Sequence, residues 1–249
     1  MRLRVPLLIA GLALAVPALA APQVTGQVPT RFTIRACPAV FGLSPQQAAY
    51  VTGRMRQIAT AAGVPLANQP CDPNAIVIVT SNKAGLLRGL EQRHPDYFPI
   101  EWSKSRIRAV EQDPGPAVAW QFEGLITPDG LRIADTTIPS LLDPVDPGSL
   151  VQATAPTTLP ASRLRPAERH DVMTSVLVVQ ASALSGLTTM QFADYAAMRT
   201  FARTDPRATA LPASDTILKV LDAPMGTAVP MSITAQDLDF LRGYYQAGH

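Results

Sequence analysis

One set of polar residues in this chain has the types and the spacing of a functional site. It stands at positions i, i+3, i+4 and i+8 of a largely apolar stretch, so a helix would place it on one face: Gln191, Asp194, Tyr195 and Arg199. In a ligand pocket, Asp194 would serve as an acid or base, while Tyr195 and Arg199 would donate hydrogen bonds. The structural alternative is that Gln191 caps the helix with Thr188, and that Asp194 pairs with Arg199 or a backbone amide. We weigh the structural role above the catalytic one and keep all four residues as candidates.

Histidine decides which nucleophilic mechanisms the chain supports, because a Ser-His or Cys-His pair needs an imidazole. His94 precedes Pro95 at an expected helix end, and His249 is the final residue, so we expect structural or solvated roles for both. His170 precedes Asp171 at the start of an apolar strand, and it is the one histidine to consider as a base. No G-x-S-x-G, H-E-x-x-H, P-loop or G-x-G-x-x-G pattern occurs, so we predict no cofactor.

The composition limits the classes of protein to which the chain can belong. Hydrophobic residues make up 47% and charged residues 16% of the 249 positions, which excludes a wholly disordered chain. Three His and two Cys are too few for most His- or Cys-rich metal clusters, and we predict no metal site. The 21 Lys and Arg nearly balance the 19 Asp and Glu, so we expect no nucleic-acid partner.

The first 20 residues have the three parts of a secretory signal peptide. Arg2 and Arg4 form a positive start, residues 5–16 are mostly apolar, and residues 18–20 (ALA) form a small-residue cleavage site. The apolar run is too short to cross a bilayer, so we expect cleavage near Ala20 and a periplasmic or secreted protein without a membrane span. An uncleaved N-terminal anchor is the alternative. Because this segment holds two of the basic residues and no acid, the mature chain carries equal numbers of both.

The two cysteines, Cys37 and Cys71, both follow this segment and would reach an oxidising compartment. We therefore predict that they form a disulfide bond. In the chain-entropy model, a bridge that closes a loop of this length stabilises the fold by about 3–4 kcal/mol. Two free buried thiols or a shared metal are the alternatives, although no His lies near either cysteine in the sequence.

The N-terminal third of the mature chain predicts a strand, a helix and a second strand. The alternating segment 31–36 predicts the first strand, and the apolar run 75–80 predicts the second. Ser44, Pro45 and Gln47 begin the helix with a capping box, and Gly63 ends it. This order suggests a βαβ unit. In such a unit Cys37 would lie at the opposite end of the sheet from the chain just before the second strand. The disulfide and the parallel pairing are thus in conflict unless the connection 64–71 runs back along the helix, and we hold the disulfide above the parallel pairing.

The rest of the chain predicts seven more elements: a helix at 83–92, a strand at 116–122 with a hairpin partner at 131–134, a strand at 172–179, a buried helix at 188–202, a short helix at 214–221 and a final helix after Thr234. We expect an α+β or mixed α/β fold. After the signal peptide (1–20), its parts are an N-terminal α/β lobe with the βαβ unit (21–136), a Pro-rich connection (137–166) and a mostly helical C-terminal lobe with one central strand (167–249).

Three segments of the last third carry a resemblance: GLTTMQFADYAAMRTFA (186–202), SDTILKVL (214–221) and ITAQDLDFLRGYY (233–245). They look like the C-terminal half of an uncharacterised family of secreted bacterial proteins, and their order is similar to that of zincin-type metallopeptidases. A zincin-type enzyme would have His-Glu-x-x-His at 191–195. Here Gln191 and Tyr195 replace the two zinc ligands and Phe192 replaces the general base. The resemblance therefore implies a degenerate, non-catalytic relative.

Export and the lack of a recognised catalytic motif favour a binding or scaffolding protein of the bacterial envelope. Its partner would be another envelope protein or a small ligand. The alternative is a hydrolase whose site lies on the 188–202 helix and uses Asp194, Tyr195, Arg199 and His170. A subunit of a larger envelope assembly is a third possibility.

Overall fold

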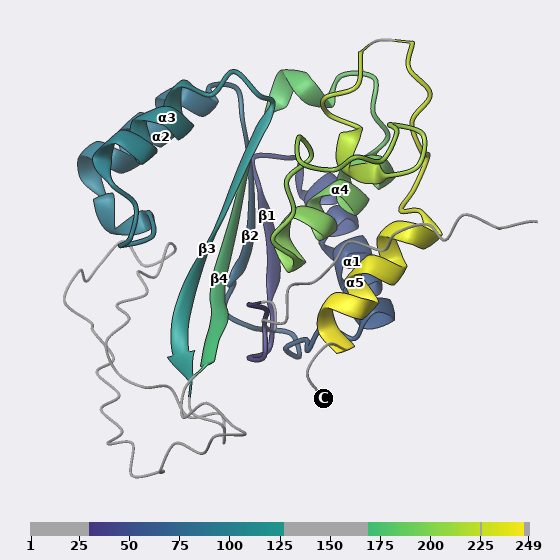
Figure 1. Cartoon of the computed structure of the whole chain (residues 1–249), viewed down its shortest axis with the longest axis horizontal. Coiled ribbons are helices and arrows are strands. Elements are labelled where there is room, and N and C mark those ends of the chain that lie inside the picture. Colours follow the sequence, from purple (N-terminus) through teal and green to yellow (C-terminus); the bar gives the residue numbers. More distant parts are fainter. Residues whose placement is uncertain (1–29, 127–168, 225, 247–249) are drawn as a thin grey trace, which may run out of the picture.

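A four-stranded mixed sheet forms the centre of the molecule, with helices on both of its faces (Figure 1). The computed structural model describes residues 30–126, 169–224 and 226–246. Along the chain the elements are β1 (Pro38–Phe41), α1 (Pro45–Ala62), β2 (Ala75–Thr80), α2 (Lys83–Arg93), η1 (Pro95–Tyr97), α3 (Lys104–Gln112), β3 (Ala117–Ile126), β4 (Arg169–Gln180), η2 (Ala181–Leu184), α4 (Thr189–Phe201), η3 (Ile217–Lys219) and α5 (Ala235–Gln246). The mixed α/β fold class is confirmed. The segments 1–20, 131–134 and 137–166 and His249 lie outside the described residues.

The βαβ unit forms as the sequence predicts. Ser44 accepts a hydrogen bond from the Gln47 amide, while the Gln47 side chain accepts one from the Ser44 amide. At the other end of α1, Gly63 adopts the left-handed conformation with φ of 80°, which a residue with a Cβ rarely takes. The helix returns the chain to the end of the sheet where β1 began, so β1 and β2 pair in parallel.

The first strand lies further along the chain than the sequence pattern indicates. We expected it at 31–36, and this was wrong, because only Ala36 of that segment forms an isolated bridge, to Leu66. The alternation arises instead from burial of Phe32, whose ring meets Phe201 edge-on. The paired strand begins at Pro38, a position that an edge strand tolerates because the missing amide takes no ladder bond there.

This shift removes the conflict between the disulfide and the parallel pairing. Cys37 precedes β1 and Cys71 precedes β2, so both lie at the same end of two parallel neighbours. The predicted Cys37–Cys71 disulfide is present, with a Cα–Cα distance of 6.1 Å. The Cys37 carbonyl also accepts hydrogen bonds from the Asn74 and Ala75 amides. The bridge therefore links the starts of the two strands of the βαβ unit.

Strand β4 lies between β2 and β3, both of which precede it in the chain, and so joins them into one sheet. It pairs in parallel with β2 and antiparallel with β3, giving the order β1-β2-β4-β3. Residues 171–179 are all buried. The segments 21–136 and 167–249, which we expected to form two lobes, thus contribute to one sheet.

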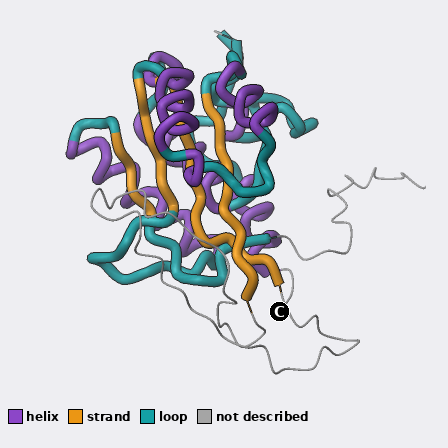
Figure 2. Tube along the Cα trace, turned by 90° about the vertical axis from the view of Figure 1, so that its left-hand side faces the viewer, coloured by secondary structure: helices purple, strands orange, loops and turns teal. Residues whose placement is uncertain are grey.

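Helices cover the sheet in two layers that contain different parts of the chain (Figures 1 and 2). Helices α1, α4 and α5 pack on one face around one apolar cluster, while α2 and α3 cover the other face around a second, smaller one. The sequence analysis did not predict helix α3, because few apolar residues stand on the face that packs against the sheet. The short helix expected at 214–221 is reduced to η3, since Asp237 takes the Ile217 amide and the Thr216 hydroxyl. No helix in the described ranges is long and apolar enough to cross a membrane.

Removal of the disulfide tests how far the βαβ unit depends on it. We expect the double variant Cys37→Ala/Cys71→Ala to lose about 3–4 kcal/mol of unfolding free energy, because its unfolded state regains the freedom of the closed loop. Urea unfolding followed by circular dichroism measures this loss. Wild-type protein treated with dithiothreitol should unfold at the same lowered urea concentration. Equal midpoints for the oxidised wild type and the variant would contradict the expected role of the bridge.

Candidate functional site

Helix α4, which carries the predicted polar set, is buried on all sides from Gln191 to Phe201. Thr188 and Gln191 form the predicted capping box at its start. The Gln191 side-chain amide also donates to the Pro230 carbonyl at 2.8 Å. Gln191 therefore fixes the beginning of the helix and the segment that leads to α5, and its amide is occupied by these contacts.

Asp194 has structural partners from two other elements. Its carboxylate receives the Arg54 Nε at 2.6 Å and the Arg54 Nη2 at 3.1 Å, in a two-pronged ion pair from α1. The Ile233 amide donates to the same carboxylate at 2.6 Å. The Asp194 side chain has no exposed surface, so these bonds replace its hydration. Asp194 thus joins α1, α4 and the segment that leads to α5. Of the two partners that the structural alternative offered, a backbone amide is present and Arg199 is not.

Tyr195 lies in the same closed interior. Burial raises the pKa of its phenol to about 12, which keeps the ring neutral at physiological pH. The three positions at which a zincin-type enzyme has its ligands and base thus hold an amide, a phenyl ring and a neutral phenol, all buried. In the described ranges, no three His, Cys, Asp or Glu side chains lie together as a possible metal site.

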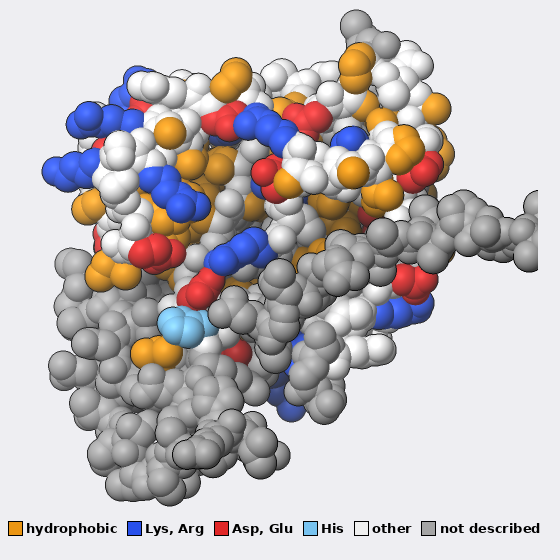
Figure 3. Space-filling model, viewed as in Figure 1, with side chains coloured by type: hydrophobic (Ala, Val, Ile, Leu, Met, Phe, Trp, Pro, Cys, Tyr) orange, Lys and Arg blue, Asp and Glu red, His pale blue; other side chains and the backbone are white. Residues whose placement is uncertain are grey.

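An open groove lies along β3, at the edge of the sheet. Its floor comes from β3 residues between Ala119 and Leu125. One wall comes from residues 100–106 before and within α3, and the other from residues 199–204 at the end of α4, with His170 beside it. The hollow, which we call the β3 groove, has a volume of about 680 Å³. Figure 3 shows this face, with basic side chains bordering the hollow.

The floor of the β3 groove presents backbone groups that the sheet does not use. In the part of the chain that the structure describes, β3 pairs with β4 alone. The Gln180 amide donates to the Pro116 carbonyl, so every second residue from Pro116 onward bonds to β4. The amides and carbonyls of Ala117, Ala119 and Gln121 therefore turn toward the free edge. An edge of this kind can accept another strand.

Two buried polar side chains border the β3 groove with unused hydrogen-bonding atoms. Gln121 is 7% exposed, and its Oε1 has no partner, while its Nε2 makes only a long contact of 3.5 Å to the Thr200 carbonyl. Arg199 is 8% exposed, and its Nε has no partner, while one Nη donates to the Thr204 carbonyl. Buried polar atoms without partners are uncommon in folded proteins. The described residues hold three more of them, on Arg56, Ser175 and Thr200, so this pair makes the groove a candidate only together with the free edge of β3.

The wall opposite α4 is aromatic. The Trp102 ring packs against a stacked pair of rings: its centre is 6.3 Å from that of Trp120 and 6.1 Å from that of Phe98, which are 5.4 Å from each other. The Arg106 guanidinium lies 4.7 Å from the centre of the Trp102 ring, in a cation–π contact. The Trp120 indole donates to the Tyr97 carbonyl, which fixes its ring in the sheet. This wall offers rigid apolar surface beside an exposed cation.

His170 lies at the rim of the β3 groove. Its side chain is exposed, which does not fit the environment of a buried catalytic base. Its Nδ1 is 3.7 Å from a Glu123 carboxylate oxygen, and Glu123 also pairs with Arg203. The structure therefore brings two of the predicted residues, His170 and Arg199, to one groove and leaves Asp194 and Gln191 in a different network. The sequence analysis missed Gln121 on β3, Trp102 just before α3 and Arg106 within α3. No functional motif marks these three positions.

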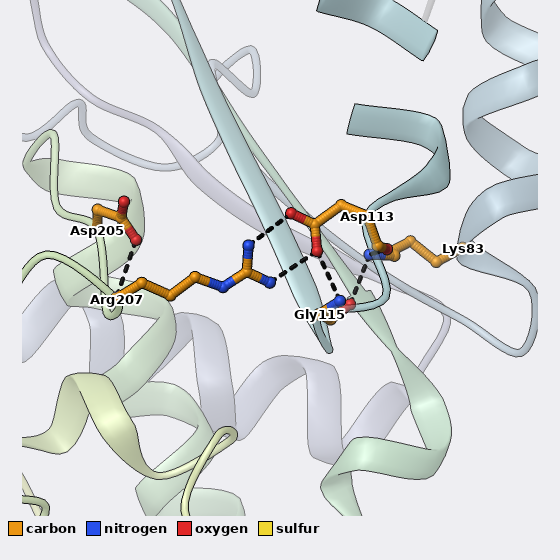
Figure 4. A network of polar contacts seen from close by, with 5 residues as sticks. All are labelled: Lys83, Asp113, Gly115, Asp205 and Arg207. Carbon is orange, nitrogen blue, oxygen red and sulfur yellow. Dashed lines mark hydrogen bonds and ion pairs between the residues drawn. The ribbon is translucent and has the colours of Figure 1, made fainter. Parts of the chain in front are cut away.

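A second polar network connects the two layers at the end of the sheet where β2 and β4 finish (Figure 4). Lys83, only 5% exposed, donates to the Asp113 and Gly115 carbonyls at 2.8 and 2.5 Å, and burial lowers its pKa. The Asp113 carboxylate receives both Nη atoms of Arg207 at 2.7 Å. A hollow of about 410 Å³ lies beside Lys83. Because each of these charged groups has a partner, the network is structural.

Loss of the Arg54 partner should leave the Asp194 charge buried without compensation. We expect Arg54→Met to lower the unfolding free energy by on the order of 3 kcal/mol, measured by urea unfolding. Arg108→Met, at an exposed position of α3, is the matched control and should change stability by less than about 0.5 kcal/mol. The double variant Arg54→Met/Asp194→Leu should be more stable than Arg54→Met, because it buries no charge. A double variant less stable than the single one would contradict this account.

Acid should weaken the contact between Arg207 and Asp113. The hydrogen bond from Arg207 lowers the pKa of the Asp113 carboxyl from 3.8 to about 2. Since the folded pKa is lowered, the pair stabilises the fold fully above pH 3.8 and loses this contribution as the pH falls toward about 2. We expect the urea midpoint of Asp113→Asn to fall less than that of the wild type over this window. The exposed control Asp96→Asn should follow the wild type, and a wild-type slope in Asp113→Asn would contradict the assignment.

No protein-family model, no curated protein and no solved structure matches this chain.

Proposed function

We propose that this chain is an exported, non-catalytic binding protein of the bacterial envelope, and that it binds an extended peptide segment of a partner protein in the β3 groove. The observation that carries this proposal is the free edge of β3 at the bottom of an open groove, between two buried side chains with unused polar atoms and an aromatic wall. A ligand that adds a strand to this edge would satisfy the backbone groups of Ala119 and Gln121.

The shape of the groove favours one extended chain over a second sheet. Neighbouring strands lie about 4.8 Å apart, so an added strand would lie directly over the groove floor. The walls at 100–106 and 199–204 rise on both sides of β3 and would obstruct the edge of another folded sheet. The groove thus protects β3 from edge-to-edge aggregation while leaving room for a peptide.

The location of the protein rests on its first 20 residues and its disulfide. A signal peptide would carry the chain to an oxidising compartment, and the Cys37–Cys71 bridge is compatible with that environment. The proposed degenerate relationship to zincin-type enzymes fits a binding role, because Gln191 and Tyr195 offer no imidazole to a zinc ion. The hydrolase alternative gains no support from Asp194, whose carboxylate is already bound by Arg54 and the Ile233 amide.

Peptide titration into the isotope-labelled protein tests this function by nuclear magnetic resonance. The panel contains acetylated and amidated peptides of about eight residues in which valine alternates with glutamine, lysine or aspartate. We expect at least one peptide to shift the amide signals of β3 and of residues 199–204. If none of them shifts these signals, or if the shifts map to the opposite edge at β1, the proposed function is wrong.

A proline variant tests whether the ligand binds as an added strand. The Ala119 amide turns toward the free edge, so Ala119→Pro removes a groove donor without breaking a bond to β4. We expect at least about tenfold weaker peptide binding, measured by calorimetry, since one backbone hydrogen bond is lost and the ring obstructs the edge. Ala119→Ser, which keeps the amide at the same position, is the matched control and should bind as the wild type does. Equal affinity of all three proteins would exclude strand addition.

A further inference from the structure

We propose that Arg199 and Gln121 form a carboxylate-binding subsite inside the β3 groove, so that the bound segment carries an Asp or Glu side chain with apolar residues on either side of it. This inference rests on the proposed function, because it names the chemistry of the peptide that the groove would take. No sequence motif marks the subsite, and it depends on two residues that are far apart in the chain.

The argument begins with the charge of Arg199. A buried guanidinium is stable only when its charge and its donors are matched. The donors of Arg199 reach the Thr204 carbonyl, but no carboxylate oxygen of the described residues lies within 4.0 Å of it. Asp222 acts on it only from beyond ion-pair distance. An anion in the groove would complete this site.

Other arginines of the molecule show what is missing at Arg199. Arg54 and Arg207, each pointing at a carboxylate, form two-pronged ion pairs with Asp194 and Asp113. Arg31, which is equally buried, donates to two carbonyls at the end of α5. Arg199, in the last turn of α4, donates to one carbonyl beyond the end of its helix, and its buried Nε has no partner among the described residues. Its unused donor geometry suits the planar oxygens of a carboxylate.

Gln121 supplies the second half of the subsite. Its side chain contacts the carbonyl of Thr200, next to Arg199, so both residues border the same part of the α4 wall. The two ends of an amide are interchangeable by rotation about the last side-chain bond, so Gln121 can present its NH₂ to a carboxylate oxygen. With its long contact to Thr200 released, it would donate to the ligand.

The alternation of side chains along a β-strand determines which residues of the peptide flank its acidic residue. Side chains of β3 alternate between the α4 side, where Gln121 and Glu123 lie, and the α3 side, where Trp120 and Phe122 lie. An added strand would alternate in the same way. A residue that meets Arg199 is therefore flanked by residues that meet the aromatic wall, where Ile100 is 97% exposed and Trp102 is half-buried.

The remaining charges of the groove also favour an acidic peptide. Arg106 contributes an unpaired cation on the α3 wall, since its contact is to the Trp102 ring. Of the two acids that line the groove, Glu123 already pairs with Arg203, and Glu101 lies exposed on the rim. A lysine side chain would meet Arg199 at the position of closest contact and would be repelled.

A double substitution, one in the protein and one in the peptide, tests the subsite. One peptide alternates valine with glutamine and has an aspartate at its centre. The second peptide is identical except that it has asparagine at that position. The wild-type protein should bind the aspartate peptide about ten- to hundredfold more tightly, as expected for a charge-assisted hydrogen bond. Arg199→Gln should bind both peptides equally. Arg108→Gln, which removes a charge at an exposed position of α3 outside the groove lining, is the matched control and should keep the preference.

The outcomes separate this inference from the function on which it rests. If the wild type binds both peptides equally well, the carboxylate subsite is wrong while peptide binding stands. If neither peptide binds but other members of the panel do, the acidic preference is wrong. A preference for a peptide with a free C-terminal carboxylate and no aspartate would also overturn the side-chain assignment. The comparison of two peptides on the wild type needs no variant, so it decides the question even if Arg199→Gln fails to fold.

Discussion

The structure depends on burying α4 completely while providing partners for the polar groups of its first turns. An apolar helix would pack between α1, α5 and the sheet without further conditions, but α4 brings Gln191, Asp194 and Arg199 into that interior. Unpaired groups of this kind are costly where water is absent. The fold meets the condition for Asp194 with Arg54 and the Ile233 amide, and for Gln191 with Thr188 and Pro230. These bonds fix the positions of α1 and α5 relative to α4.

Arg199 is the member of this set that the interior leaves incomplete. It stands in the last turn of α4, where the helix passes the free edge of β3, and its Nε has no partner in the part of the chain that the structure describes. The same helix thus has two parts with different roles. Its first turns hold the molecule together through closed polar contacts, and its last turn borders an open groove.

The sheet order explains why that groove exists. Strand β4 enters between β2 and β3, so β3 becomes an edge strand although it precedes β4 in the chain. The helices that cover the two faces form the walls of this edge, since α3 begins near it on one face and α4 ends near it on the other. A free edge flanked by two walls is accessible to a single extended chain. The function that we propose is therefore a consequence of the topology as much as of any one side chain.

Local patterns in the sequence determined the elements whose signals are contained within a few residues. Ser44 with Gln47, Thr188 with Gln191 and Thr234 with Asp237 begin three helices, because each capping box closes within one turn. The apolar runs at 75–80 and 172–179 became the two central strands. Alternation alone misled at 31–36, because burial of Phe32 gives the same pattern as a strand without a ladder.

The tertiary structure alone decided which of the polar residues meet. The sequence placed Asp194 and Arg199 on one helix, but it contained no sign that Arg54, 140 positions earlier, would take the carboxylate. Nor did it indicate that Gln121 and Arg199 would border one groove, since their meeting requires β3 to be an edge strand. Capping depends on neighbours in the chain, and the sequence shows it; ion pairs and grooves depend on which elements pack together, and only the folded chain determines that.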